Sequence, residues 1–260
     1  MVSRIGSFDY INNDLIQRLS KIANGKKIIS SADDAAGMAI SQIMTGQYKG
    51  MQQAINNVQN AYSMLNVASG AMGDIQDTMN KMKELSVQAA NGIYTDQDKQ
   101  NIQQEYNQLA QHVEDVYRNT QYNGKSLFQN DQMTLQVGPN SGDTQTIDIP
   151  NLGKQIQTLS KVNLANDAQN AMKTIDNIQL SVSSAQSTLG SIQNNLDEQT
   201  NNLMVSYENI VASQSQIVDA DMAKEMLMQT TDQIKSAASL YSVIDFKNTT
   251  LAYMESLLSG

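Results

Sequence analysis

A long heptad pattern of apolar residues constrains this chain more than any other feature of its sequence. Between residues 44 and 82, apolar side chains recur at steps of three or four, and Gln, Asn, Lys and Asp fill most of the positions between them. The apolar positions are Met44, Tyr48, Met51, Ile55, Val58, Tyr62, Leu65, Ala68, Met72, Ile75, Met79 and Met82. This pattern predicts a long amphipathic helix whose narrow apolar face needs a partner of similar length.

A second pattern of the same period supplies that partner. Its apolar positions are Ala168, Met172, Ile175, Ile178, Val182, Ala185, Leu189, Ile192, Leu196, Leu203, Tyr207 and Ile210. We expect helices at about 34–91 and 166–217 to pack antiparallel, with a shorter helix at about 95–117 against the same core. Thr95 should cap the shorter helix, and Ser30 and Ser31 offer a cap for the first long one. Four glycines inside the first long helix favour close approach of another backbone, and the alternative is that a long helix simply tolerates them.

Two short segments alternate apolar and polar residues, at 133–137 and 144–149, with a turn-rich stretch between them. They predict one β-hairpin at about 133–149, which ends at Pro150. The following residues, 151–165, are expected to form a loop or a turn-rich segment. The fold class is therefore mainly α: a long antiparallel helical bundle or coiled coil with one β-hairpin.

Shorter helices are expected at both ends of the chain, at about 3–22 and 222–257. The topology brings them to the same end of the bundle, where they should pair as a thinner coiled coil. Their apolar edges exceed what one molecule can cover, so we expect copies of the chain to stack through them. The residues predicted for self-assembly are Ile5, Ile11, Leu15, Leu19, Leu240, Val243, Leu251 and Leu257.

Composition argues against several classes of function. The net charge of −9 disfavours binding to nucleic acid or to an anionic membrane, and no apolar run reaches the length of a membrane span. The chain has no Cys, and His112 is its only histidine. His112 therefore has no second histidine or cysteine with which to form a catalytic or metal site. Paired aspartates such as Asp33 and Asp34 are read as helix caps. We expect no enzyme activity and no cofactor.

Several distinctive motifs follow one another along the chain. They are Ile-Ala-Asn-Gly-Lys-Lys-Ile at 22–28, Ser-Ala-Asp-Asp-Ala-Ala-Gly at 31–37, Lys-Glu-Leu-Ser-Val-Gln-Ala-Ala-Asn at 83–91, Thr-Gln-Tyr-Asn-Gly at 120–124, Leu-Gln-Val-Gly at 135–138 and Ile-Val-Asp-Ala-Asp-Met-Ala-Lys-Glu-Met at 217–226. In sequence, order and spacing they resemble the motifs of bacterial flagellin, and the resemblance extends over nearly the whole chain.

The resemblance implies a flagellin-like fold of two domains. Residues 1–33 and 218–260 are expected to form an inner-tube coiled-coil domain with spoke linkers, and residues 34–217 a rod domain. About fifteen residues separate the hairpin from the second long helix, so the chain resembles a minimal flagellin with divergent termini. The first 22 residues lack the apolar core of a secretory signal peptide, and the resemblance implies type III export instead.

The resemblance also implies a function and partners. The chain is expected to polymerise into the extracellular flagellar filament for motility, with contacts to an export chaperone at the C-terminal helix and to filament cap and hook-junction proteins. An animal Toll-like receptor is a further expected partner, through Lys81, Lys83, Glu84, Leu85, Gln88 and Glu105. Lysines stand where the family's receptor motif has arginines, which removes bidentate geometry. The alternatives are a filament-junction relative and a non-polymeric secreted scaffold or adhesin.

Overall fold

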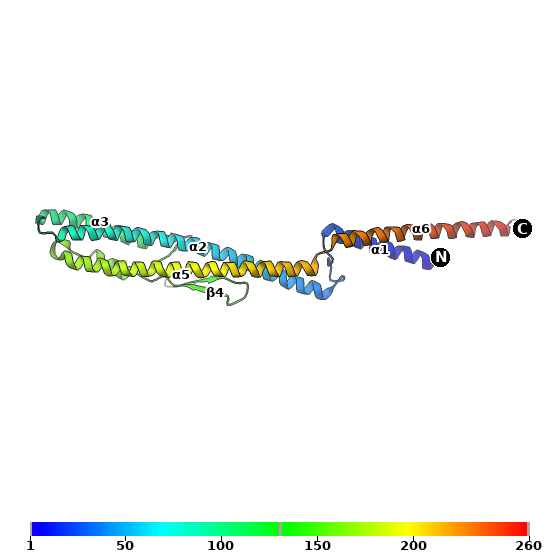
Figure 1. The fold of residues 1–260 in the computed structure, drawn as a ribbon, viewed down its shortest axis with the longest axis horizontal. Helices are drawn as coiled ribbons and strands as arrows, with labels where there is room; N and C mark the ends of the chain where they lie inside the picture. The colour runs from blue at the N-terminus through cyan, green and yellow to red at the C-terminus, as the bar shows by residue number, and fades with distance from the viewer. Residues whose placement is uncertain (1, 130–131, 259–260) are drawn as a thin grey trace. The chain divides into compact units, whose positions relative to one another are not determined.

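The computed structural model describes residues 2–129 and 132–258, with side chains from residue 10 onward except 255 and 256. Its elements are α1 (Val2–Asn24), α2 (Ala35–Ala90), α3 (Asp96–Asn119), β1 (Gln121–Tyr122), β2 (Lys125–Ser126), β3 (Met133–Gln136), β4 (Thr144–Ile147), α4 (Gly153–Leu159), α5 (Leu164–Val218) and α6 (Met222–Leu258). The predicted class, mainly α with long helices and a β-hairpin, is confirmed (Figure 1).

The chain divides into two compact units. The smaller contains residues 1–48 and 208–260, and the larger contains residues 49–207. Helices α2 and α5 each contribute residues to both units. The domains expected from the sequence, residues 1–33 with 218–260 and residues 34–217, were instead divided near the ends of the long helices. That division remains a proposal.

The core of the larger unit is the apolar pattern read from the sequence. Residues of α2 and α5 run side by side, and α3 packs along them (Figure 1). The fully buried side chains of α2 include Leu65, Met72, Ile75, Met79 and Met82. Large aliphatic and methionine side chains fill most of this core, together with the buried aromatic rings of Tyr106, Tyr117 and Phe128. The heptad pattern therefore predicted which face is buried.

Helix caps explain where two of the helices begin. Thr95 accepts a hydrogen bond from the backbone N–H of Asp98, and the Asp98 carboxylate accepts one from Thr95 N–H, which completes a capping box. Helix α2 begins after Asp34, whose carboxylate accepts a hydrogen bond from Gly37 N–H at 2.9 Å. The prediction that Ser30 or Ser31 caps α2 was therefore wrong, because Asp34 directly precedes the helix and its side chain accepts the hydrogen bond from the first turn.

The β-hairpin is present, with Met133 opposite Ile147 and Gln136 opposite Thr144. Two further features were not predicted. A second, smaller hairpin pairs β1 with β2, and residues 153–159 form α4 where the sequence suggested only a loop. Helix α4 buries Ile156 and Leu159 against the core, and tertiary packing of these side chains stabilises so short a helix.

The Tyr117 hydroxyl joins three segments of the larger unit. It donates a hydrogen bond to the Phe128 carbonyl at 2.9 Å and accepts one from Leu152 N–H at 3.1 Å. Its ring stacks on that of Phe128, with centroids 5.3 Å apart. Because Tyr117 ends α3 and Leu152 precedes α4, this one side chain fixes the chain on both sides of the β3–β4 hairpin.

The four glycines of α2 do not share one reason. A Cβ on Gly50 would lie 2.9 Å from Cβ of Pro139, so this glycine admits the hairpin loop. Within the described chain, a Cβ on Gly46, Gly70 or Gly73 would meet no atom within 4 Å. The interpretation of close approach is therefore right at Gly50. At the other three positions, no neighbouring segment of the described chain explains why glycine is present.

In the smaller unit, α1 lies along the first part of α6 (Figure 1). The segment from Gly25 to Lys27 pairs with residues 218–220, since Lys27 N–H donates to the Val218 carbonyl at 2.7 Å and Ala220 N–H to the Gly25 carbonyl at 3.0 Å. Gly25 has a φ of 65°, which suits glycine. Among the described helices, none has the length and hydropathy required to cross a membrane.

Candidate self-assembly surface

Helices α1 and α6 are joined by a partly buried ion-pair cluster. The Arg18 guanidinium donates to the Asp232 carboxylate and, at 3.4 Å, to Glu225. Lys235 also binds Asp232, at 3.1 Å. Asp232 is buried, and the hydrogen bonds from Lys235 and Arg18 lower the pKa of its carboxyl group despite that burial. The cluster fixes the antiparallel pairing of the two helices near the connection to the long helices.

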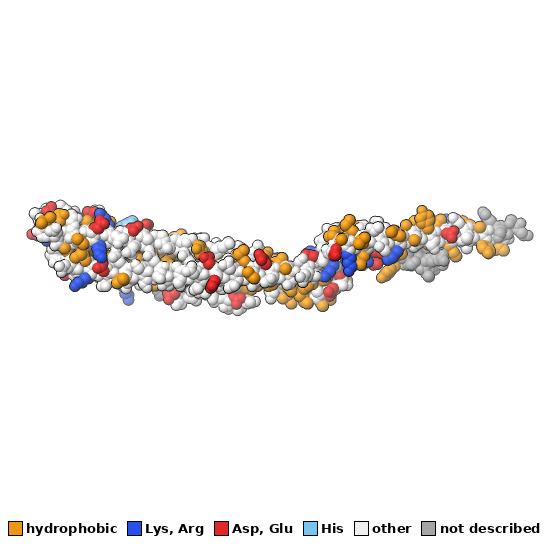
Figure 2. All heavy atoms as spheres, in the orientation of Figure 1, with side chains coloured by type: hydrophobic (Ala, Val, Ile, Leu, Met, Phe, Trp, Pro, Cys, Tyr) orange, Lys and Arg blue, Asp and Glu red, His pale blue; other side chains and the backbone are white. Residues whose placement is uncertain are grey.

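Apart from this cluster, much of α6 is apolar and exposed. Figure 2 shows hydrophobic side chains over the described part of this helix. Its exposed large apolar residues are Met222, Met226, Leu227, Ile234, Leu240, Tyr241, Ile244, Phe246, Leu251, Tyr253, Met254, Leu257 and Leu258. These positions do not fall on one side of a helix, so pairing with α1 alone cannot cover them. A helix exposed in this way needs further partners.

The predicted self-assembly residues fall into three groups. Leu19, Leu240, Leu251 and Leu257 are exposed. Ile11, Leu15 and Val243 are half-buried. The side chain of Ile5 lies outside the described residues. The two ends of the chain therefore carry apolar side chains that the described molecule leaves open to solvent.

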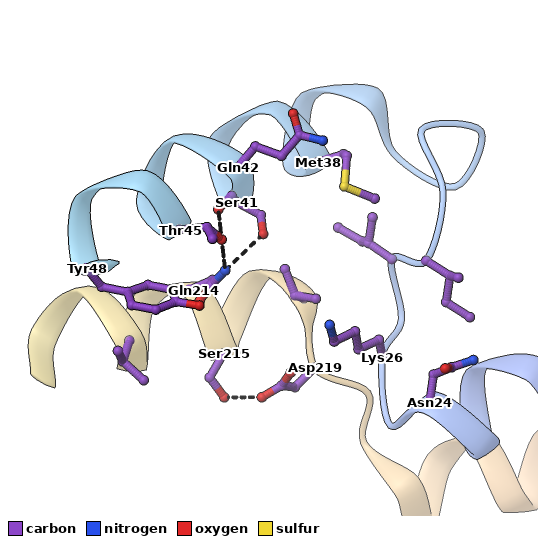
Figure 3. A pocket seen from close by; sticks show the side chains of 14 residues that line it. Asn24, Lys26, Met38, Ser41, Gln42, Thr45, Tyr48, Gln214, Ser215 and Asp219 are labelled. Atoms are coloured by element: carbon purple, nitrogen blue, oxygen red, sulfur yellow. Dashed lines mark hydrogen bonds between the residues drawn. The ribbon is translucent and has the colours of Figure 1, made fainter. Parts of the chain in front are cut away.

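A cavity of about 530 Å³ lies in the smaller unit, between the start of α2, the end of α5 and the extended segment after α1 (Figure 3). Gln214 donates hydrogen bonds from Nε2 to Thr45 Oγ1 at 2.6 Å and to Ser41 at 3.3 Å. Ser215 donates to Asp219 at 2.6 Å. The lining combines amide, hydroxyl, aliphatic and thioether side chains with two oppositely charged ones, Lys26 and Asp219, so it offers hydrogen bonds and two charges.

Asp33 organises the same connection. Its carboxylate accepts hydrogen bonds from the N–H groups of Ser30 at 3.0 Å and Ile29 at 3.1 Å, and it pairs with Lys21 at 3.2 Å. These interactions lower its pKa to about 2, with the two backbone hydrogen bonds as the largest causes. The interpretation of both aspartates as helix caps therefore holds for Asp34, whereas Asp33 closes the turn before α2.

The residues expected to contact a receptor lie in the larger unit. Lys81, Glu84, Gln88 and Glu105 are exposed, and Lys81 binds Glu84 at 2.9 Å. Lys83 forms an ion pair with Asp176 of α5. Leu85 is only 5% exposed and packs in the core, so its side chain is not part of the surface. The other five positions remain predictions for receptor contact.

Sequence reasoning missed Arg18 and Asp232. A signal was available for Arg18, because it lies three residues after Leu15 and four before Ile22. A charge on the apolar face of a helix requires an opposite charge on the facing element when it is buried. Asp232 supplies this charge.

The comparisons with known proteins decide the family. A model of the bacterial flagellin N-terminal helical region matches residues 7–133, and a model of the C-terminal helical region matches residues 172–249. Together the two matches span more than three quarters of the chain. This chain belongs to the bacterial flagellin family.

Individual relatives agree with this assignment. The phase 1 flagellin of Salmonella naestved is 39% identical over 138 residues, which cover 53% of this chain and 27% of that flagellin. The chain therefore matches only about a quarter of the length of this curated relative.

Solved structures agree as well. A Bacillus cereus flagellin structure is 28% identical, with a TM-score of 0.53 over 57% of this chain and 88% of that one. A flagellar hook-associated protein from Vibrio parahaemolyticus has a TM-score of 0.61 over 72% of this chain and all of that one. At 17% identity, this second likeness shows a shared fold alone.

Proposed function

We propose that this flagellin is a structural subunit that polymerises into the extracellular bacterial flagellar filament for motility. The exposed apolar surface of α6 carries the proposal. Covering such a surface releases about 25 cal/mol for each Å² of apolar area removed from water. Addition of each copy to a growing end would cover this surface on α6, and α1 would take part through Leu19 and its half-buried neighbours.

The proposed role is structural rather than enzymatic. Flagellins are a family of structural proteins, which supports this role. The hook-associated likeness is a likeness of fold, so it does not favour a junction role over a filament role.

Electron microscopy of the purified protein after salt precipitation tests the proposal. We expect filaments from the full chain, and only soluble monomer from a variant that lacks residues 1–20, because the α1–α6 pair is then lost. Circular dichroism should show that the long helices of this variant remain folded. Normal filaments from the deletion variant would reject assembly through the terminal helices.

Further partners follow from the same assignment. The exposed α6 surface is suited to an export chaperone that covers it before assembly, and the filament ends to cap and hook-junction proteins. For a Toll-like receptor, we propose contacts through Lys81, Lys83, Glu84, Gln88 and Glu105. Replacing Lys81 and Lys83 with Arg should tighten binding of the receptor ectodomain to the monomer, since Arg offers bidentate geometry. Unchanged affinity would argue against this surface.

A further inference from the structure

The methionines of this chain divide into protected and accessible groups. The chain has 15 methionines and no cysteine, so thioether is its only sulfur chemistry. Met72, Met79 and Met82 are fully buried in the larger unit. Among the described side chains, the exposed methionines are Met204, Met222, Met226 and Met254. Three of these four lie on α6, the helix with the proposed assembly surface.

Met222 and Met226 form a pair at the fixed end of α6. They lie one helical turn apart on the same face and are 40% and 56% exposed, beside Leu227 at 70%. This end of α6 is held in place, because residues 218–220 pair with the segment after α1 and Arg18 binds Glu225. The two thioethers are therefore presented to solvent from an ordered helix, unlike thioethers in a buried core.

We propose that Met222 and Met226 are an oxidation site at which a hydroperoxide controls subunit addition. The inference rests on the proposed function, since it assumes that assembly covers this face. In the reaction, the thioether sulfur attacks one peroxide oxygen, the O–O bond breaks and a sulfur–oxygen bond forms. The sulfur loses two electrons, and hydrogen peroxide is reduced to water. The product is methionine sulfoxide, a polar and reversible modification.

The neighbouring Met228 provides an internal comparison. Its sulfur accepts a hydrogen bond from Arg18 Nη1 at 3.0 Å, and its side chain is only half-exposed. The lone pair that would attack peroxide is thus partly engaged. We expect the exposed methionines of α6, Met222, Met226 and Met254, to oxidise first, Met228 later, and the buried methionines of α2 last.

Oxidation should weaken assembly without unfolding the subunit. A sulfoxide oxygen buried between copies without a donor carries the desolvation cost of an unpaired polar group. Because 1.4 kcal/mol corresponds to tenfold in an equilibrium constant, two such groups should raise the critical concentration for polymerisation by about tenfold or more. The pair is exposed in the monomer and lies outside the core of the larger unit, so the helical content should stay unchanged.

The test treats purified full-length monomer with hydrogen peroxide and follows each methionine by peptide mass spectrometry. The polymerisation of treated and untreated protein is then compared by sedimentation. The single variant M254L should stay sensitive to peroxide. In that background, the double variant M222L/M226L preserves side-chain volume and should polymerise equally well before and after treatment. The matched control M204L should remain as sensitive to peroxide as the unchanged protein.

Two results would overturn the proposal. One is normal polymerisation of protein whose Met222 and Met226 are fully oxidised. The other is loss of polymerisation in peroxide-treated M222L/M226L in the M254L background, which would assign the effect to other residues. Failure of the untreated chain to form filaments would instead reject the proposed function, and the order of oxidation would still be measured independently.

Discussion

Gln179 on α5 donates a hydrogen bond from Nε2 to Oδ1 of Asn80 on α2, at 2.8 Å. Two heptads away along both helices, Gln193 donates in the same way to Asn66, at 3.0 Å. The apolar faces repeat every seven residues and would tolerate a shift by one heptad, whereas paired side-chain amides match in one alignment only. Polar pairs at the edge of a coiled coil are known to select register. We infer that these two pairs help to select the alignment of α2 and α5.

A double-mutant cycle on these amides tests the inference. Asn80→Ala and Gln179→Ala should show a coupling of about 0.5 kcal/mol in urea unfolding, the size of a weak net hydrogen bond at the surface. The matched control is the pair Asn80→Ala and Gln193→Ala, whose side chains do not touch each other. Equal coupling in the two cycles would show that the amides do not act in pairs.

Core methionines should contribute far more to stability than exposed ones. Met72 is fully buried, so Met72→Ala leaves a cavity and should lower the free energy of unfolding by about 2–5 kcal/mol. Met204 is exposed, and Met204→Ala should change it by less than about 0.5 kcal/mol. Thermal unfolding followed by circular dichroism measures both. Similar losses from the two variants would contradict the assigned core.

Glycine substitutions separate the two kinds of site in α2. At Gly70 a Cβ meets open space, so Gly70→Ala should stabilise the monomer by about 0.5–1 kcal/mol through helix propensity. At Gly50 a Cβ meets Cβ of Pro139 at 2.9 Å and its Cα at 3.3 Å, so Gly50→Ala should gain less or lose stability. Chemical denaturation compares the two. A larger gain at Gly50 would contradict the close approach of the hairpin loop.

Asp33 gives the connection between α1 and α2 a defined pH dependence. Its pKa in the folded state is about 2, below the unfolded value of about 3.9, so its contribution is complete above the unfolded value. The contribution should fall as the pH drops through about 2. Asp33→Asn should cost about 1 kcal/mol at pH 7, the net size of a typical intramolecular hydrogen bond. Acid titration of both proteins should show the difference disappearing near pH 2, and a constant difference at all pH values would refute the assignment.

The Arg18 cluster should matter more than an ordinary surface charge. Arg18→Met leaves Asp232 buried with one fewer partner and should destabilise the α1–α6 pair by about 1–3 kcal/mol. It should also raise the pKa of Asp232, which nuclear magnetic resonance titration can follow. Lys224→Met, which removes an exposed positive charge from α6, the helix that carries Asp232, is the control. Equal effects from the two variants would show that the cluster is not a specific link.

The period of the apolar residues predicted the long helices, their buried faces and the β3–β4 hairpin. In a helix and in a strand, side chains on one face recur with a fixed period, so an apolar period shows which face is buried. Helix α4 was missed since its seven residues have little helical preference of their own and depend on packing of Ile156 and Leu159. Similarly, Leu85 was assigned to a surface through family resemblance, although its position in the apolar period places it in the core. Pairings between distant charges, such as Arg18 with Asp232, depend on how α1 and α6 align with each other, and a single sequence does not reveal this alignment.

The central claim is that copies of this flagellin assemble by covering the exposed apolar side chains of α6. Leu227 and Ile234 are 70% and 64% exposed, so the double variant L227S/I234S should fold as a monomer yet form no filaments. Ile93, which is exposed in the turn before α3, provides the control I93S, which should still polymerise. The decisive measurement is electron microscopy of salt-treated protein at matched concentration. Filaments from the control alone are the expected result, and abundant filaments from L227S/I234S would contradict the account.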